Sequence, residues 1–168
     1  MNYVNLIIGN LCSLLAMATD SISSTRKTAK EMLLIQNLSQ LVYCTSGIVL
    51  KGYSAAVQNV VSMLRNFLAI KKVNSKVAEW ILVLLGVVLG VWFNNLGLMG
   101  YLPVIANLQY TLVMFRFREN ERALKISFLV NAALFAVFNI VIYNVVGVVT
   151  NLVVFVTTGL CLIRPKKA

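Results

Sequence analysis

Long apolar segments alternate along the chain with short polar or charged connections. Seven segments approach the ~20 residues that a helix needs to cross a bilayer, which is longer than most buried helices of soluble proteins. They cover residues 3–20, 31–50, 53–70, 78–95, 98–115, 122–143 and 145–163. Only Lys51 and Gly52 separate the second from the third, and the last two meet near Asn144, so five or six longer crossings are the alternatives.

Composition places the chain among membrane proteins. Of its 168 residues, 60% are hydrophobic and 12% are charged, whereas soluble domains average roughly 45–50% and 25%. Seven crossings of ~20 residues use ~140 positions, so no soluble or catalytic domain fits beside the helices. We therefore predict an all-α polytopic membrane protein, with residues 1–168 forming a single membrane domain.

The distribution of charge decides between these counts. The chain has 15 Lys and Arg against 5 Asp and Glu, a net charge of +10, which on a soluble protein would suggest a nucleic-acid or acidic partner. Here the cations gather in every second connection, as they do in cytoplasmic loops. The clusters are Arg26, Lys27 and Lys30; Lys71, Lys72 and Lys76; Arg116, Arg118, Arg122 and Lys125; and Arg164, Lys166 and Lys167. Seven helices with the N-terminus outside place all four clusters and the C-terminus in the cytoplasm, and no nucleic-acid partner is expected.

The first third of the chain resembles the last third. Three asparagines recur in the same order on three successive helices of each half. The pairs are Asn10 with Asn107 at an offset of 97 residues, Asn37 with Asn131 at 94, and Asn59 with Asn151 at 92. The segment 78–95 has no copy, and chance similarity between apolar helices is the alternative explanation. We predict a first three-helix repeat over 1–76, an inverting linker helix over 77–96 and a second three-helix repeat over 97–168.

The predicted linker helix has a topological role. Three helices that start outside end inside, so a copy can take the same orientation only after one extra crossing. The two halves are then parallel repeats related by an axis along the membrane normal, an arrangement found in transporters whose solute site lies near the midplane between the halves. Gly86 and Gly90 on this segment would let it pack against its own bundle, which we favour, or join two protomers in a homo-oligomer.

A recognisable order of features runs from Lys27 to Lys72. It contains Gln36-Asn37, the short turn Lys51-Gly52-Tyr53, then Gln58-Asn59 and Arg65-Asn66. In this order the chain resembles the YgjV-type family of bacterial inner-membrane proteins, and the arrangement of three, one and three helices is similar to the SWEET and PQ-loop (MtN3-like) transporter superfamily. The resemblance covers nearly the whole chain, although the superfamily's Pro-Gln pair is absent. It implies a multi-pass protein of the bacterial inner membrane.

The resemblance also implies roles for individual residues. In SWEET-like carriers an asparagine on the third helix of each repeat contacts the solute, and Asn59 and Asn151 stand at the matching places. The hinge proline in the first helix of each repeat has one counterpart, Pro103, whereas the stretch around Leu6 has none. Matched hinges in both halves are therefore not assumed.

Six asparagines are predicted to lie within roughly 6 Å of the membrane midplane, at ~1.5 Å rise per residue. They are Asn10, Asn37, Asn59, Asn107, Asn131 and Asn151. An unsatisfied amide in hydrocarbon costs ~2–7 kcal/mol, so these side chains should face the interior, where they would bind a polar solute. The alternative is that they only join helices by hydrogen bonds. We favour that alternative for Asn37 and Asn131, and solute binding for Asn59 and Asn151.

The ionisable residues favour passive movement of a solute. The acids fall at predicted helix ends or in inner loops, and the chain has no His, so no proton relay or sodium ligand is predicted at depth. These acids are Asp20, Glu31, Glu79, Glu119 and Glu121. Arg65 alone lies well inside a helix. We expect its side chain to extend to the cytoplasmic surface, and the alternative is a place at an inner gate that binds an anionic solute.

Enzymatic chemistry is not expected. The chain has no Ser–His or Cys–His combination and no glycine-rich phosphate loop, and Cys12, Cys44 and Cys161 lack the spacing of a metal site. We predict no cofactor and no metal. The predicted function is facilitative transport (uniport) of a small, uncharged polar solute such as a sugar, vitamin or nucleoside. The alternative is a non-transporting interaction or accessory protein whose asparagines only stabilise the bundle.

Overall fold

The computed structural model describes residues 2–24, 26, 28–73, 75–117 and 120–163. Within them the chain forms seven α-helices and one short 3-10 helix, with no strand. They are α1 (Tyr3–Ser24), α2 (Ala29–Val49), α3 (Tyr53–Ile70), α4 (Lys76–Trp92), η1 (Gly97–Gly100), α5 (Tyr101–Arg116), α6 (Glu121–Val141) and α7 (Val145–Ile163). The prediction of an all-α fold with seven helices is confirmed. The largest difference in bounds is at the end of α1, which extends past the predicted residue 20 to Ser24.

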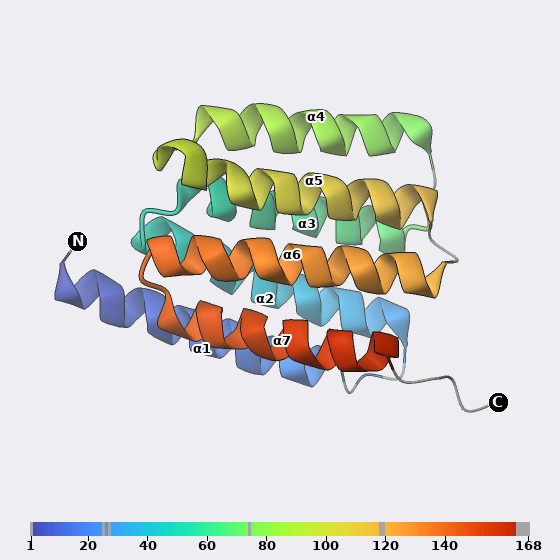
Figure 1. Cartoon of the computed structure of the whole chain (residues 1–168). Coiled ribbons are helices and arrows are strands. Elements are labelled where there is room, and N and C mark those ends of the chain that lie inside the picture. The colour runs from blue at the N-terminus through green and yellow to red at the C-terminus, as the bar shows by residue number, and fades with distance from the viewer. Residues whose placement is uncertain (1, 25, 27, 74, 118–119, 164–168) are drawn as a thin grey trace.

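Five helical segments among the described residues are long and apolar enough to cross a membrane. They are Tyr3–Ser23, Lys30–Val49, Gly97–Arg116, Arg122–Val141 and Val145–Ile163. The helices α3 and α4 run roughly parallel to the other helices of the bundle (Figure 1). However, α3 carries a polar face that includes Gln58 and Arg65, and α4 has only 17 residues. That α3 and α4 also cross the membrane stays a prediction.

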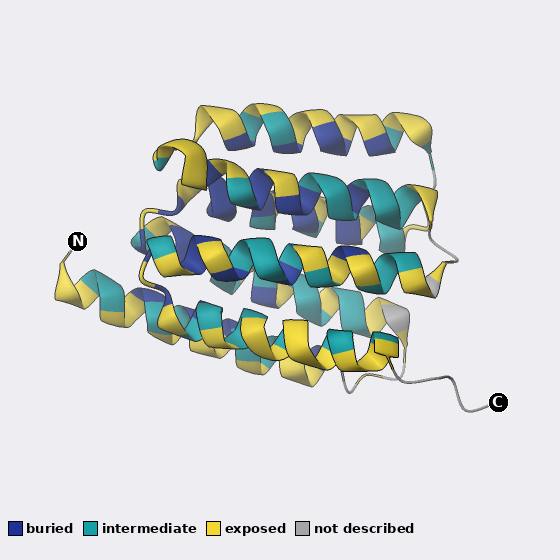
Figure 2. Cartoon of the chain, viewed as in Figure 1, coloured by how far each residue is buried: buried dark blue, intermediate teal, exposed yellow. Residues whose placement is uncertain are grey.

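Apolar side chains cover the outside of the bundle, while small and polar side chains fill much of its interior. The helices α1 and α7 are exposed along most of their length (Figure 2), with Ile7 and Val153 among the exposed residues. Buried positions instead include Ser13, Gln58 and Asn107. This pattern is typical of helices in lipid, because lipid tails solvate apolar side chains while small and polar residues join the helices.

The helices close into a ring in chain order, with α4 on its outside. Successive helices pack together in the series α1–α2–α3 and again in α5–α6–α7. Contacts between α3 and α5 join the two series on one side, and contacts between α1 and α7 join them on the other. The helix α4 packs against α3 and α5 at the edge of the bundle (Figure 1). If α1, α2 and α3 exchanged places with α5, α6 and α7, the α3–α5 junction would become the α1–α7 junction.

The α2–α3 and α6–α7 turns have the same backbone geometry, 92 residues apart. Lys51 has a φ of 58° and Tyr143 a φ of 57°, in the left-handed region that ends many helices. The backbone N–H of Gly52 donates to the Gly47 carbonyl at 2.7 Å, and that of Asn144 donates to the Asn139 carbonyl at 2.9 Å. The two turns thus reverse the chain in the same way, and Lys72 at the end of α3, with a φ of 55°, adopts this backbone conformation as well.

The helices before these turns also match at this offset. Both ends of α6 lie 92 residues after the ends of α2, and their N-caps, Thr28 and Asn120, accept bonds from the backbone N–H groups of Glu31 and Ala123. At this offset Asn131 corresponds to Ser39. The predicted pairing of Asn37 with Asn131, at 94, is therefore two residues out of register.

Two glycines seat α4 against its own bundle. Gly86 and Gly90 are buried, and the Gly86 carbonyl accepts a hydrogen bond of 2.7 Å from Gln58 Nε2 on α3. A Cβ atom at Gly90 would lie 2.5 Å from Gln58 Nε2 and 2.5 Å from Val104 Cγ2 on α5. The glycine face therefore packs inside the chain, as favoured from the sequence.

Candidate functional site

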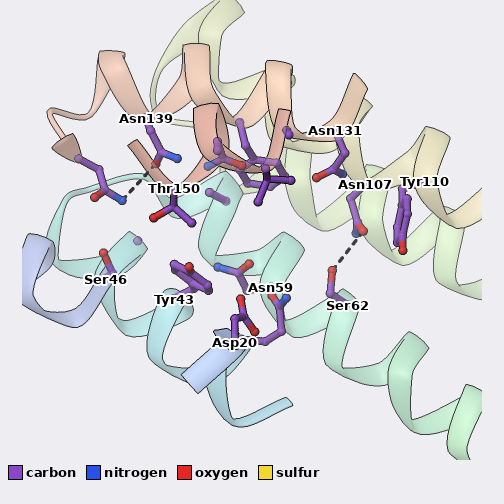
Figure 3. Close-up of a pocket in the computed structure, with 18 of the residues that line it drawn as sticks. Asp20, Tyr43, Ser46, Asn59, Ser62, Asn107, Tyr110, Asn131, Asn139 and Thr150 are labelled. Carbon is purple, nitrogen blue, oxygen red and sulfur yellow. Dashed lines mark hydrogen bonds between the residues drawn. The ribbon is translucent and has the colours of Figure 1, made fainter. Parts of the chain in front are cut away.

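A cavity of about 210 Å³ lies between the two series of helices, and every helix of the ring contributes to its lining. Most of the labelled side chains in Figure 3 are polar and converge on this space. The polar lining residues are Asp20, Gln40, Tyr43, Ser46, Asn59, Ser62, Arg65, Asn107, Tyr110, Asn131, Asn139, Asn144, Thr150 and Asn151. The volume is many times what one water molecule needs, so a small solute fits.

Lining residues occur in pairs at the offset of 92. The pairs are Gln40 with Ala132, Tyr43 with Phe135, Gly47 with Asn139, Asn59 with Asn151, and Ser62 with Val154. Corresponding faces of α2 and α6, and of α3 and α7, therefore point into the same cavity. In most pairs the two side chains differ in chemistry. Matching positions of the two series therefore line the cavity, but with side chains of different polarity.

Asn59 and Asn151 both line the cavity without joining helices. The Asn59 amide makes no hydrogen bond with any described residue. Asn151 Nδ2 donates to the Gly147 carbonyl within α7 at 2.8 Å, which leaves its Oδ1 atom without a partner in the described chain. These two side chains therefore offer hydrogen-bonding groups to a molecule in the cavity.

Arg65 is buried in the bundle, so the expectation that it extends to the cytoplasmic surface is wrong. Its side chain is 7% exposed. Nη1 donates to Asn107 Oδ1 at 2.7 Å and to Thr111 Oγ1 at 3.3 Å, and the guanidinium carbon lies 4.7 Å from the centre of the Tyr110 ring. Because α5 supplies these partners, the side chain turns toward the cavity that it lines.

Asn107 lines the cavity and also joins α5 to α3. Its Nδ2 donates to Gln58 Oε1 at 2.7 Å, and its Oδ1 accepts from Ser62 Oγ at 3.2 Å as well as from Arg65. Gln58 continues the network to the Gly86 carbonyl on α4. The predicted alternatives of solute contact and helix joining are therefore both compatible with Asn107.

The remaining predicted asparagines have different surroundings. Asn131 lines the cavity and donates to the Ala106 carbonyl at 3.0 Å. Asn10 is not part of the lining: its Nδ2 donates to the Tyr143 carbonyl at 3.1 Å and its Oδ1 accepts from the Val146 N–H at 3.1 Å. Asn37 is also outside the lining, and its buried Oδ1 has no partner in the described chain. Four of the six predicted asparagines therefore line one cavity, and the other two lie outside its lining. The four are Asn59, Asn107, Asn131 and Asn151.

Pro103 lies in the first turn of α5, which follows directly on η1. A proline there breaks no helical hydrogen bond, because the first N–H groups of a helix have no partner within it. Its hinge role stays a prediction, and the position it would act on is the junction of η1 with α5.

Asp20 lines the cavity, although the sequence interpretation placed it at the end of the first helix. Since α1 continues to Ser24, Asp20 lies about one turn inside the helix, where it lines the cavity and accepts a hydrogen bond from Ser39 Oγ. The expectation that every acid lies at a helix end or in a loop is wrong for this residue. The helix end predicted at residue 20 was the cause.

Asn139 and Asn144 are two further lining residues that the sequence interpretation missed. Asn144 Oδ1 accepts from the Gly147 N–H at 2.9 Å, as a helix N-cap does, and its Nδ2 donates to Ser13 Oγ at 2.9 Å and to Asn139 Oδ1 at 3.1 Å. An asparagine directly before an apolar helix is a capping signal. Asn139, within an apolar segment, should have been counted with the other intramembrane amides.

The described residues also include cysteines and an ion pair outside the cavity lining. They hold no group of three potential metal ligands, and Cys12, Cys44 and Cys161 are free. Arg116 Nε pairs with Glu79 Oε1 at 2.8 Å between α5 and α4, where Arg116 also lies 5.8 Å from the Trp80 ring. This ion pair strengthens the packing of α4 and lies outside the cavity lining.

One of three comparisons with known proteins identifies a family for this chain. No curated protein and no solved structure matches the chain. The family model Imp-YgjV, described as bacterial inner membrane protein, matches residues 7–168. Membership in the wider SWEET and PQ-loop superfamily stays a prediction. Since the match includes all or part of every helix and agrees with the membrane-spanning segments found above, the chain belongs to the YgjV family of bacterial inner-membrane proteins.

Proposed function

We propose that this protein is a facilitative transporter of a small polar solute across the bacterial inner membrane. The observation that carries the proposal is the polar cavity of about 210 Å³ between two similarly built halves. The transported solute would belong to the class of small polar molecules that includes sugars, vitamins and nucleosides. The predicted orientation, with an outside N-terminus and a cytoplasmic C-terminus, follows from the cation clusters in the connections.

The unpartnered amide of Asn59 supports solute binding. An amide that faces hydrocarbon without a partner costs ~2–7 kcal/mol, yet Asn59 has no hydrogen bond with the described chain and lines the cavity. Water or a polar solute in the cavity would satisfy it. A residue that only joined helices would instead be bonded across a helix interface.

The internal similarity supports a transport mechanism. Parallel repeats related by an axis along the membrane normal form carriers in which one half moves against the other around a central site. The matched turns at Lys51 and Tyr143 and the paired lining residues fit this arrangement. The junctions α3–α5 and α1–α7 are the contacts that such a movement would open in turn.

A non-transporting interaction protein is the second candidate, and the bonds of Asn10 favour it. This amide joins α1 to the α6–α7 turn and does not line the cavity. If all intramembrane amides served this purpose, removal of any of them would destabilise the bundle. Asn10 and Asn59 therefore form a matched pair that separates the two candidates.

The test begins with thermal unfolding of the purified protein in detergent with a panel of sugars, nucleosides, water-soluble vitamins and amino acids, because a bound solute raises the melting temperature. The solute that raises the melting temperature most is then radiolabelled, and its counterflow into proteoliposomes that contain the protein is measured. We expect Asn59→Ala to keep the melting temperature and lose counterflow, and Asn10→Ala to lower the melting temperature and keep solute preference. No stabilising solute, together with equal destabilisation by both variants, would favour the interaction protein.

A further inference from the structure

We propose that the solute is a small zwitterion whose carboxylate pairs with Arg65 and whose ammonium group pairs with Asp20. This inference rests on the proposed transport function and narrows its solute class. It replaces the general expectation of an uncharged polar solute with a molecule that has no net charge but carries both signs.

Arg65 is a buried cation that forms no ion pair with any described residue. Its recorded partners are the neutral oxygens of Asn107 and Thr111 and the face of the Tyr110 ring. Its Nε atom is buried and has no hydrogen-bond partner in the described chain. An ion that leaves water without a counter-charge is strongly disfavoured. A carboxylate in the cavity would supply the missing charge, and guanidinium groups bind carboxylates through two parallel hydrogen bonds.

Asp20 lines the same cavity and forms no ion pair with any residue that the structure describes. Its recorded partner is the neutral hydroxyl of Ser39. The ion pair recorded among the described residues joins Arg116 to Glu79 instead, away from this lining. The cavity therefore presents one charge of each sign, and the two do not pair with each other.

The two charges lie among different neighbours. Figure 3 draws Asp20 near Tyr43 and Asn59, whereas Asn107, which accepts a bond from Arg65, is drawn near Tyr110. A solute that bridges them would be held at both ends. The amides of Asn59 and Asn151 would remain available for a polar group between or beside those ends.

Charge balance selects the zwitterion over a simple ion. An anion alone would pair with Arg65 but would bring a like charge toward Asp20. A cation alone would pair with Asp20 but would bring a like charge toward Arg65. A molecule with both groups offsets both buried charges and adds no net charge to the membrane interior.

The test uses ligands that lose one charge at a time. The purified full-length protein is unfolded thermally with each of the twenty standard amino acids and with glycine betaine. For the amino acid that stabilises most, we then measure its amide, which lacks the negative charge, and its hydroxy acid, which lacks the positive charge. Each relative should bind at least about tenfold more weakly, as expected for loss of a charged hydrogen bond.

Two variants assign each charge to its residue. Arg65→Gln should abolish discrimination against the amide and keep discrimination against the hydroxy acid, and Asp20→Asn should do the opposite. The double variant Glu79→Gln, Arg116→Gln removes the ion pair outside the cavity and should change neither. Because Arg65 also holds Asn107, its variant can fail to fold. The ligand series on the unmodified protein and on Asp20→Asn then decides by itself.

The outcomes separate this inference from the proposed function. Stabilisation and counterflow of neutral sugars or nucleosides, with none from any zwitterion, would overturn the inference and support transport. A hydroxy acid that binds as well as its amino acid would overturn the pairing with Asp20 and identify an anion carrier. Absence of stabilisation by every compound and of all counterflow would overturn both proposals.

Discussion

Arg65 on α3 and Asn107 on α5 are joined by a hydrogen bond of 2.7 Å from Nη1 to Oδ1. The same amide donates to Gln58 at 2.7 Å and accepts from Ser62 at 3.2 Å, so one side chain of α5 holds three residues of α3. These four residues join α3 to α5, and three of them, Ser62, Arg65 and Asn107, also line the cavity.

Asn107→Ala should destabilise the folded protein by about 1–3 kcal/mol, the usual cost of leaving buried polar groups without a partner. Gln58 Oε1 would lose its recorded donor, and Arg65 would keep only the Thr111 hydroxyl at 3.3 Å. Chemical unfolding in detergent measures the difference. Asn151→Ala is the control, because that amide bonds only within its own helix, and an equal loss in both variants would contradict the assignment.

Gly90→Ala should weaken the packing of α4 by about 1–3 kcal/mol, the range for forcing extra atoms into a packed core. Its new Cβ would lie 2.5 Å from both Gln58 Nε2 and Val104 Cγ2. Gly86→Ala is the matched control on the same helix face, since its nearest neighbour, Gln58 Oε1, lies at an ordinary contact distance of 3.4 Å. Thermal unfolding should rank the Gly90 variant well below the Gly86 variant, and the reverse order would show that α4 is seated differently.

Lys51→Gly and Tyr143→Gly should each stabilise the protein by up to about 1 kcal/mol, because a left-handed backbone disfavours side chains by roughly that amount. The two residues have nearly equal φ angles of 58° and 57°, so the gains should also be nearly equal. Lys71→Gly, at a φ of −76°, should bring no such gain. A gain at one turn only would argue that the two turns are not equivalent.

Cysteine labelling should show that α3 crosses the membrane, although it is not among the five described segments that are long and apolar enough to do so. In a variant with the three native cysteines replaced by serine, Lys51→Cys should react with a membrane-impermeant maleimide added to whole cells. Lys72→Cys, at the other end of α3, should react only after the cells are opened. Both positions are exposed. Labelling of both from outside would refute the predicted crossing, and labelling of Lys72→Cys alone would invert the topology.

The helices and their general environment could be predicted from the sequence because they depend on local properties. Apolar length predicts a membrane helix without reference to other segments, and the close-packed glycine face of α4 followed from a spacing of four residues. The candidate site was found in part for the same reason. An amide avoids lipid wherever its helix packs, so Asn59, Asn107, Asn131 and Asn151 were expected to face inward, and all four line the cavity.

The direction of the other polar side chains depends on partners that are far away in the chain. Arg65 turns inward because Asn107 and Thr111, 42 and 46 residues later, meet it at the α3–α5 junction. Asn10 leaves the cavity because the α6–α7 turn, 133 residues later, offers it a carbonyl. Neither relation has a local signal, so sequence spacing could not distinguish a surface arginine from a cavity arginine.

A bundle of apolar helices with polar residues kept from the lipid is predictable from the sequence, because hydropathy and helix length act segment by segment. That Asp20 and Arg65 line one cavity without pairing is seen only in the folded chain, because it depends on how α1 and α3 are placed around the space that α5, α6 and α7 complete. The offset of 92 residues was likewise visible only in the structure, where the turn geometry, the bounds of α2 and α6 and their N-cap bonds all repeat while most side chains differ.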